Sequence, residues 1–476
     1  MKFAFLSSHE SNPVDEATDK TEEQTMPAFP APPATDTADR SLPITEQIPR
    51  PRINTSKPTT LSRGRALLLI ILLSIPVLHA LTIGPTQFLG SQGWAFVLNG
   101  SSATRNNLLS NLPQSEQHPQ AGTTAQPSLT PQQYIDLIVS RMSLDQKLGQ
   151  MMLIQFVGPT YSPDLSTMIS QYGIGAVLLS SANGNIQSKQ QLTSLTRQMQ
   201  SNSPIPLIIS TDQEGGTVDR LVRLDGPSPA AATIGATGDP NLARADGIRT
   251  AQALTSYGIN LNLAPVVDVT NVYNPQLYDR TFGTTPALVT QMARAYLDGL
   301  QQSGKVFGTL KHFPGLGDVS VDPHTGLPRL TRPLDQLEQI DWAPYRALIQ
   351  QGNVHAIMVT HEIVTAVDSS VPSSLSYKLI TGILRQQLGF QGVVMTDSLT
   401  MEGISAYYTE GQAAAMAVEA GDDLLMGAAT PADVANMIEG LKQAISAGNL
   451  NEQRINISVE RILMLKYDLG LLPLPA

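Results

Sequence analysis

The sequence contains no cysteine and has no excess of positive charge. Without cysteine, the 476-residue chain has no thiol nucleophile, thiolate metal site or disulfide, and its redox compartment stays open. Its formal net charge is −10, from 30 basic and 40 acidic side chains, so it offers no basic surface and we expect no nucleic-acid partner. A chain of this length can bury a sizeable core, so we expect a globular domain.

Long apolar runs are also scarce, and a single one has the length of a membrane span. Residues 66–83, ALLLIILLSIPVLHALTI, match the ~17–25 residues that cross a bilayer and contain His79 as their one ionisable group. Because 65 residues precede this run, an uncleaved signal anchor fits better than a cleaved signal peptide. Four arginines lie shortly before the run and none directly after it: Arg50, Arg52, Arg63 and Arg65. By the positive-inside rule the N-terminus is then cytoplasmic and the remaining chain extracellular, with a buried core helix as the alternative.

Composition divides the rest of the chain. Residues 1–62 are rich in Pro, Thr, Ser, Asp and Glu without hydrophobic periodicity, which predicts a disordered cytoplasmic tail. Residues 84–128 have a similar polar character and are expected to be a flexible linker. The folded domain is predicted over residues 129–476. It begins with two helix starts, each an N-cap followed three residues later by glutamine: Thr130 with Gln133, and Ser143 with Gln146.

The domain repeats a pattern of short apolar runs separated by segments of helix length. The runs cover residues 151–157, 175–180, 206–211, 260–269, 306–313, 354–361, 392–397 and 422–427. They are apolar on both faces, which is typical of parallel strands covered on both sides. Eight such units predict an α/β fold of the (β/α)8 TIM-barrel type. A doubly wound open sheet is the alternative, although QFVGPTYSP after the first run is not a glycine-rich phosphate loop.

Charged and polar side chains concentrate where these predicted strands end. They are Asp212, Glu214, Asp268, Lys311, His312, His361 and Asp397 at or just after strand ends, and Arg220 and Arg280 in the following loops. In a barrel these positions share one face, so we expect one site. Carboxylates and basic groups together suit a neutral ligand rich in hydroxyl groups, because each forms charge-assisted hydrogen bonds. For any single residue, a salt bridge that braces a loop is an equal alternative.

Two positions suggest catalytic roles. Asp397 emerges from the apolar segment VVMTD, so it should be a partly desolvated carboxylate at a rigid position, as a nucleophile requires. The alternative is a helix N-cap, because DSLTMEG resembles a helix start. His324 lies two residues after Asp322, and such a carboxylate orients an imidazole for general acid–base work. Spacing alone equally allows an ordinary loop histidine.

Taken in order, these motifs resemble glycoside hydrolase family 3, and specifically its single-domain bacterial β-N-acetylhexosaminidases. The resemblance covers about residues 132–470 and rests on MSLDQKLGQM, DQEGG, NLAPVVDV, DRTFG, KHFPG and TDSLTMEGI. It implies that Asp397 is the nucleophile and that His324, assisted by Asp322, is the acid/base. It also implies that five residues bind the terminal sugar: Asp212, Arg220, Arg280, Lys311 and His312. The chain departs from the family pattern at Leu316 (usually His), Pro323 (usually Ser) and Thr217 (often Arg). Leu316 removes a hydrogen-bonding group from its loop, and Pro323 restricts Asp322 toward an extended backbone.

The resemblance implies retaining hydrolysis of terminal β-linked N-acetylhexosamine, without a cofactor or metal. Because the apolar run predicts an extracellular domain, cell-wall or chitin-type oligosaccharides are the expected substrates, and we expect the protein to be monomeric. Phosphorolysis is a further hypothesis, since a histidine acid/base places less negative charge near an incoming anion. Three alternatives stay open: a β-glucosidase of the same family, a metal-dependent hydrolase using His312, His324, His361 and aspartates as ligands, and a non-catalytic sugar-binding protein.

Overall fold

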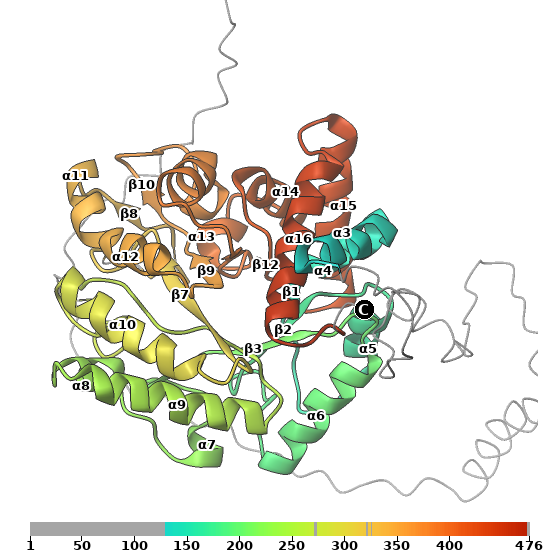
Figure 1. Cartoon of the computed structure of the whole chain (residues 1–476). Coiled ribbons are helices and arrows are strands. Elements are labelled where there is room, and N and C mark those ends of the chain that lie inside the picture. The colour runs from blue at the N-terminus through green and yellow to red at the C-terminus, as the bar shows by residue number, and fades with distance from the viewer. Residues whose placement is uncertain (1–128, 271–273, 320–321, 325, 474–476) are drawn as a thin grey trace, which may run out of the picture. The chain divides into compact units, whose positions relative to one another are not determined.

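The computed structural model describes residues 129–270, 274–319, 322–324 and 326–473 (Figure 1). The predicted cytoplasmic tail, membrane span and linker all lie outside these ranges, so they stay predictions. Within the described ranges, no helix is both long enough and apolar enough to cross a membrane.

Both predicted helix starts are confirmed. Helix α3 (Pro131–Arg141) begins after Thr130, whose side chain accepts the Gln133 N–H while the Gln133 side chain accepts the Thr130 N–H. Helix α4 (Leu144–Gln150) repeats this reciprocal arrangement with Ser143 and Gln146. Each capping box satisfies backbone donors that a helix N-terminus would otherwise leave unpaired, which fixes where the two helices begin.

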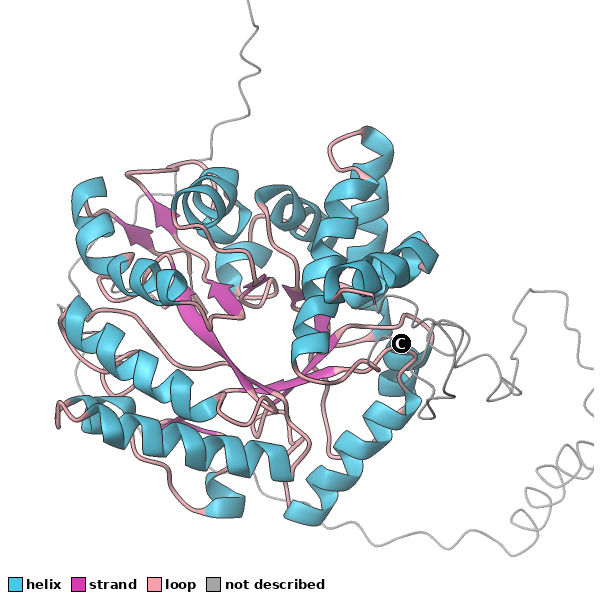
Figure 2. Cartoon of the chain, in the orientation of Figure 1, coloured by secondary structure: helices cyan, strands magenta, loops and turns pink. Residues whose placement is uncertain are grey.

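Eight parallel strands form the centre of the domain, one within each predicted apolar run (Figures 1 and 2). They are β1 (Met152–Ile154), β2 (Ala176–Leu179), β3 (Ile208–Thr211), β6 (Leu261–Asn262), β7 (Phe307–Phe313), β9 (Ala356–Val359), β11 (Val393–Thr396) and β12 (Leu425–Met426). Their order is β11-β9-β7-β6-β3-β2-β1-β12, and a parallel bridge between Met395 and Leu424 joins the two ends. The sheet therefore closes into a barrel, and the open doubly wound alternative is wrong.

Two small strand pairs lie outside the barrel. Strands β4 (Gln213–Gly215) and β5 (Val218–Asp219) form an antiparallel hairpin directly after β3. Strands β8 (Arg329–Leu330) and β10 (Ile363–Val364) pair in parallel. Both pairs belong to loops that follow barrel strands, so they shape the end of the barrel where a site is expected.

Helices surround the barrel in the cartoon (Figures 1 and 2). Those that follow α3 and α4 are α5 (Pro163–Ser170), α6 (Lys189–Asn202), α7 (Val222–Asp225), α8 (Ala231–Gly235), α9 (Pro240–Ser256), α10 (Pro286–Leu300), α11 (Leu334–Gln336), the π-helix η1 (Leu337–Asp341), α12 (Ala343–Gln351), the 3-10 helix η2 (Ser373–Leu375), the π-helix η3 (Lys378–Gln387), α13 (Glu402–Ser405), α14 (Glu410–Ala420), α15 (Pro431–Ala447) and α16 (Glu452–Asp468). Strands β1, β2, β3, β9 and β11 are buried along their whole length, as strands covered on both faces should be.

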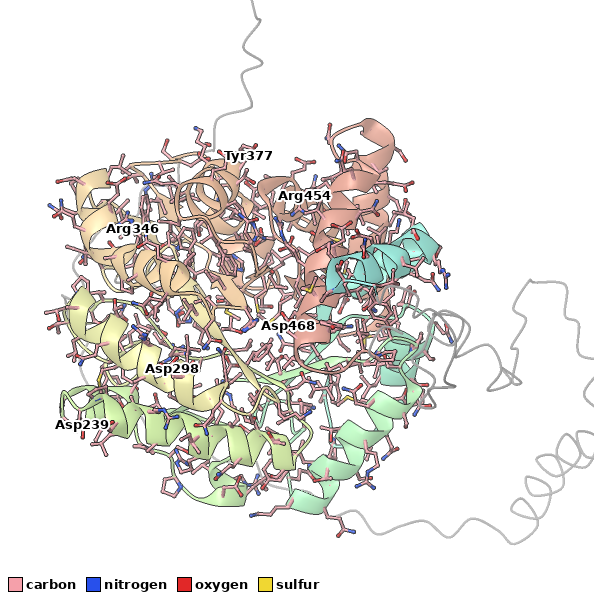
Figure 3. The ribbon with its side chains drawn as sticks, viewed as in Figure 1. Asp239, Asp298, Arg346, Tyr377, Arg454 and Asp468 are labelled. Carbon is pink, nitrogen blue, oxygen red and sulfur yellow. The ribbon has the colours of Figure 1, made fainter. Side chains whose placement is uncertain are left out.

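Helices α9 and α10 approach each other closely because each has a glycine at the contact. A Cβ atom on Gly247 would lie 2.2 Å from the Tyr296 carbonyl oxygen, and one on Gly299 would lie 2.1 Å from the Arg244 carbonyl oxygen. Any larger residue would push the two helices apart. Asp298, labelled on α10 in Figure 3, is exposed, whereas seven other residues of this helix are buried, so α10 buries one face and leaves the other in solvent.

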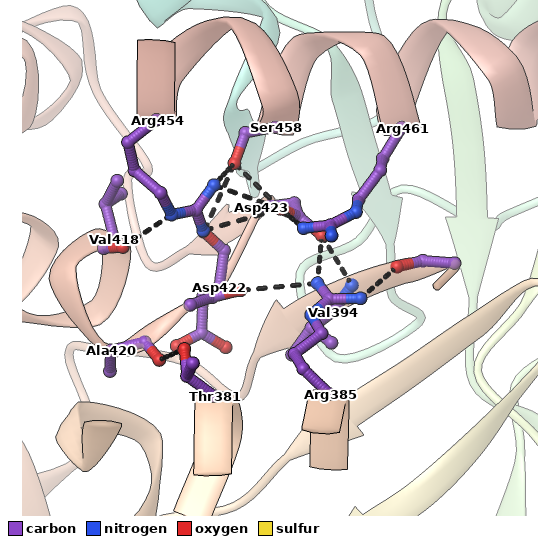
Figure 4. A network of polar contacts seen from close by, with 12 residues as sticks. Thr381, Arg385, Val394, Val418, Ala420, Asp422, Asp423, Arg454, Ser458 and Arg461 are labelled. Atoms are coloured by element: carbon purple, nitrogen blue, oxygen red, sulfur yellow. Dashed lines mark hydrogen bonds and ion pairs between the residues drawn. The ribbon is translucent and has the colours of Figure 1, made fainter. Parts of the chain in front are cut away.

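A buried ion network stabilises the start of β12 (Figure 4). The fully buried Asp423 carboxylate accepts hydrogen bonds from the guanidinium group of Arg385 on η3 and from the Ser458 hydroxyl on α16, the latter at 2.8 Å. Arg461 Nη1 lies 3.2 Å from Asp423 Oδ1, and Arg454 contacts the same oxygen. Burial opposes ionisation, but the three arginines lower the pKa of Asp423. The network joins the last barrel strand to two helices that are distant in sequence.

Candidate active site

All eight residues predicted for the site line one cavity of about 650 Å³ at the carboxyl ends of the strands. They are Asp212, Arg220, Arg280, Lys311, His312, Asp322, His324 and Asp397. These residues are spread over nearly 190 positions of the sequence, and closure of the barrel brings them together. The structure places these eight residues at one cavity together with Glu214, whereas Asp268 and His361, which also follow predicted strands, do not line it. The individual roles of the eight residues stay predictions.

Glu214 connects the basic residues of the cavity; the sequence placed it after a strand but assigned it no role. Its Oε1 lies 2.6 Å from Lys311 Nζ, and its Oε2 accepts a hydrogen bond of 2.7 Å from Arg280 Nε. Lys311 Nζ also donates to Asp212 Oδ1 at 2.8 Å. Burial alone would raise the pKa of Glu214, but Lys311 and Arg280 lower it to about 2. The pair of acids therefore fixes both cations in place.

The two glycines of DQEGG explain how Glu214 reaches this position. Gly215 has φ +88° and Gly216 has φ +57°, and a Cβ on Gly216 would lie 2.6 Å from Asp279 Oδ2. Glycine alone tolerates both the backbone angle and this approach. The next residue, Thr217, donates to Asp279 through its N–H at 2.9 Å and its hydroxyl at 2.7 Å. The threonine at this family-variable position therefore holds the loop that carries Arg280.

Asp268 orients His312; the sequence placed it at a strand end and likewise assigned it no role. Asp268 Oδ2 lies 2.8 Å from His312 Nδ1, and Arg280 Nη2 lies 3.4 Å from His312 Nε2. A guanidinium can only donate, so Nε2 is the acceptor and Nδ1 carries the proton given to Asp268. Asp268 Oδ1 also accepts the Leu316 N–H at 2.8 Å. Leu316 holds its turn through its backbone, and its side chain gives the cavity an apolar wall.

Strand β11 delivers Asp397 to the cavity. The Asp397 N–H donates to the Val359 carbonyl at 2.8 Å, and Asp397 Oδ1 accepts the Ser398 N–H at 2.7 Å. Burial raises the pKa of Asp397, but its polar surroundings, including the hydrogen bond from the Ser398 N–H, lower it overall, so the carboxylate is ionised at neutral pH. Helix α13 begins only at Glu402, after Met401 as N-cap. The alternative that Asp397 is a helix N-cap is therefore wrong.

His324 and Asp322 form a pair in the loop after β7. Asp322 Oδ1 lies 2.8 Å from His324 Nδ1 and accepts the His324 N–H at 3.0 Å. The imidazole is 69% exposed, so it meets both the cavity and solvent. Burial would raise the pKa of Asp322, but these two bonds to His324 help to lower it. The contact with Asp322 orients the imidazole, and the acid/base role of His324 stays a prediction.

The same domain matches known proteins. Residues 143–465 match the glycosyl hydrolase family 3 N terminal domain. The chain belongs to glycosyl hydrolase family 3. The family resemblance drawn from the sequence motifs is thus confirmed, and the predicted site residues fall inside the matched range.

Two family 3 relatives carry hexosaminidase names. The chain is 37% identical over 338 residues to beta-hexosaminidase A of Pseudoalteromonas piscicida, covering 65% of this chain and 56% of the relative. It is 34% identical over 341 residues to beta-hexosaminidase LpqI of Mycobacterium tuberculosis, covering 69% and 84%. The match therefore spans little more than half of the Pseudoalteromonas protein.

A solved family 3 structure shares the fold. The chain superimposes on a glycoside hydrolase family 3 beta-N-acetylglucosaminidase from Paenibacillus with a TM-score of 0.66 and 34% identity, over 69% of this chain and 63% of that one. Within the described residues, no group of three or more His, Asp or Glu side chains is arranged to hold a metal ion. The side chains of the cavity instead pair with one another.

Proposed function

We propose that this domain is a retaining exo-β-N-acetylhexosaminidase that removes terminal β-linked N-acetylglucosamine from oligosaccharides. One observation carries the proposal: an ionised, rigidly held carboxylate, Asp397, and a carboxylate-paired imidazole, His324, line the same cavity. This combination supplies a nucleophile and a proton donor to one glycosidic bond. The hexosaminidase names of the relatives support the choice of sugar.

In the proposed reaction, Asp397 attacks the anomeric carbon while His324 protonates the departing oxygen. Asp322 occupies Nδ1 of His324, so the proton passes through Nε2. The glycosyl–Asp397 bond then forms as the leaving group departs, and His324 next removes a proton from water, which displaces Asp397 and restores its carboxylate. The sugar product keeps its β configuration after these two inversions.

The proposed sugar-binding groups differ in how many of their hydrogen-bond donors are free to bind a sugar. Lys311 and Arg280 are already held by Glu214, so they present fixed donors to a hydroxyl group. Arg220 Nε is buried and has no hydrogen-bond partner in the part of the chain that the structure describes. A buried donor without a partner is costly, so a ligand oxygen at this point would be stabilising.

The charge of the cavity favours water over phosphate as the acceptor. Five acidic side chains line it, Asp212, Glu214, Asp322, Asp397 and Glu402, against three that are permanently basic, Arg220, Arg280 and Lys311. Excess negative charge repels an incoming phosphate dianion. We therefore expect turnover of an aryl glycoside to stay unchanged when phosphate is added. Phosphate-dependent turnover that yields a sugar 1-phosphate would contradict hydrolysis.

The activity is tested by comparing aryl β-N-acetylglucosaminide with aryl β-glucoside as substrates for the purified protein. We expect the first to be hydrolysed far faster, and faster hydrolysis of the glucoside would favour the β-glucosidase alternative. Asp397→Asn should abolish turnover, with Asp298→Asn, an exposed aspartate outside the cavity, as a matched control that stays active. If the unaltered protein binds the sugar but does not hydrolyse the glycoside, the result would favour the non-catalytic sugar-binding alternative.

The cellular position of the domain is a further part of the proposal. We infer from residues 66–83 and the preceding arginines that the protein is a single-pass membrane protein with this domain outside the cell. Cell-wall fragments and chitin-type oligosaccharides are then the accessible substrates. Protease added to intact cells should digest the domain, whereas protection until the cells are lysed would contradict this topology.

A further inference from the structure

His361 lies just beyond the end of β9, behind the turn that carries Asp397, and it does not line the cavity. The side chain is fully buried, and both of its ring nitrogens have partners. Nδ1 lies 2.7 Å from the Ser374 hydroxyl oxygen, and Nε2 lies 2.9 Å from the Ser398 carbonyl oxygen. Ser398 directly follows Asp397, so one imidazole connects a distant loop to the turn of the proposed nucleophile.

The partners determine how the ring is protonated. The Ser398 carbonyl can only accept, so Nε2 must carry a proton. Burial lowers the pKa of His361, which keeps the ring neutral, and Nδ1 then accepts the Ser374 hydroxyl proton. The titratable groups that face Asp397 are His361, His312 and His324. A neutral His361 fixes the turn by hydrogen bonding and leaves the negative charge on Asp397.

Ser374 is itself held firmly. It belongs to η2, where the preceding Ser373 hydroxyl donates to the Thr360 carbonyl and the Ser373 N–H donates to the Glu362 carbonyl at 2.7 Å. These two acceptors flank His361 in the chain. The segment that carries Ser374 is therefore tied to the same strand end as His361, which keeps the Ser374 backbone close to the ring.

The Ser398 backbone is bound on every side as a result. Its N–H donates to Asp397 Oδ1, its carbonyl accepts from His361, and the next N–H, that of Leu399, donates to the Met426 carbonyl at 2.8 Å. These contacts leave little freedom in the two peptide planes that follow Asp397. They keep the Ser398 N–H on Oδ1 and leave Asp397 Oδ2 for the anomeric carbon.

We propose that His361 and Ser374 form a positioning pair that holds the Asp397–Ser398 turn and so aims the Asp397 carboxylate at the sugar. The inference rests on the proposed role of Asp397 as the nucleophile. His361 touches no substrate in this scheme, so its contribution acts through the Ser398 carbonyl. Removing it should slow the chemical step and leave ground-state binding of the sugar in place.

Three variants and a control test the pair. His361→Gln can place an amide N–H near the position of Nε2, whereas the shorter His361→Asn cannot reach the Ser398 carbonyl. Ser374→Ala removes only the partner of Nδ1. His355→Gln is the matched control, because His355 is a histidine outside the cavity that stacks on Phe307 at 3.8 Å between ring centroids.

With aryl β-N-acetylglucosaminide, we expect His361→Asn to lower kcat by about 100-fold with KM changed less than about threefold, since misplacing a reacting group by ~1 Å costs roughly that factor. His361→Gln should recover about 10-fold of the loss, and Ser374→Ala should lose less than His361→Asn. The acid limb of kcat/KM against pH should move to higher pH in His361→Asn, because the Ser398 N–H no longer stabilises the Asp397 carboxylate. The control should keep the kcat and pH profile of the unaltered protein.

The inference is overturned if His361→Asn raises KM at constant kcat. It is also overturned if the loss of kcat in His361→Asn equals the unfolded fraction of the variant measured by circular dichroism, while the acid limb of kcat/KM stays at the same pH. Equal kcat in His361→Gln and His361→Asn would also overturn it. Failure of the proposed function is separate: it would appear as Asp397→Asn retaining turnover, whatever the His361 variants do.

Discussion

Replacing Glu214 by glutamine removes the negative charge that lies between Lys311 and Arg280. The carboxylate is nearly inaccessible, with a side chain 3% exposed, and its pKa falls from 4.5 to about 2 on folding. The difference of about 2.5 units, at about 1.4 kcal/mol per unit, gives roughly 3 kcal/mol of stability from the ionised group at neutral pH.

The pH dependence follows from the sign of the shift. A lowered pKa means that the stabilisation is fully present above 4.5 and is lost as pH falls toward about 2. In urea unfolding, Glu214→Gln should therefore be less stable than the unaltered protein by about 3 kcal/mol at pH 7 and by only about 1 kcal/mol at pH 3. The exposed Glu402→Gln should change stability by less than about 0.5 kcal/mol at both pH values. An equal loss of unfolding free energy in Glu214→Gln at both pH values would show that the Glu214 charge is not the source of the stabilisation.

Three further changes probe buried carboxylates. Asp423→Ala leaves Arg385 and its neighbouring arginines without their shared partner, so unfolding in urea should show a loss of about 3–5 kcal/mol; a loss below 1 kcal/mol would show that the network is not stabilising. Burial and Asp423 raise the pKa of Asp422 well above its usual range, so the folded protein loses stability as pH rises. Asp422→Asn should therefore melt at the same temperature as the unaltered protein, or at a higher one, at pH 7. A lower melting temperature would contradict a neutral Asp422 carboxyl. Asp268→Asn should lower kcat/KM by about 10- to 100-fold as His312 loses its charged partner, and an unchanged value would mean that His312 does not contact the sugar.

The barrel was predictable because its strands are buried on both faces, so each strand appears in the sequence as a continuous apolar run. The first and last residues of individual strands were harder to predict. The run 260–269 yields only the two-residue strand β6, Leu261–Asn262, and Pro265 follows soon after with no N–H to donate to a neighbour. The π-helix η3 also left no signal, since the sequence pattern of a π-helix resembles that of an ordinary amphipathic helix.

The site was predictable to the extent that residue types mark the ends of strands. What the sequence could not supply is which charges pair. Glu214 and Asp268 were visible at strand ends, yet their contacts with Lys311 and His312 span 97 and 44 positions and depend on the closed barrel. His361 was visible in the same way, but only its burial behind the Asp397 turn separates it from the cavity residues. The Glu214 signal was its place in DQEGG, two residues after Asp212.

In the proposed reaction, Asp397 forms a covalent bond with the sugar. The most direct measurement is the mass of the protein and of its proteolytic peptides after reaction with an activated 5-fluoro-N-acetylglucosaminyl fluoride, whose glycosyl-enzyme hydrolyses slowly. We expect one sugar to be added, on the peptide that contains Asp397, and no sugar to be added to the Asp397→Asn variant. A sugar attached to another residue, or turnover that releases the α anomer with no label at any time, would contradict it.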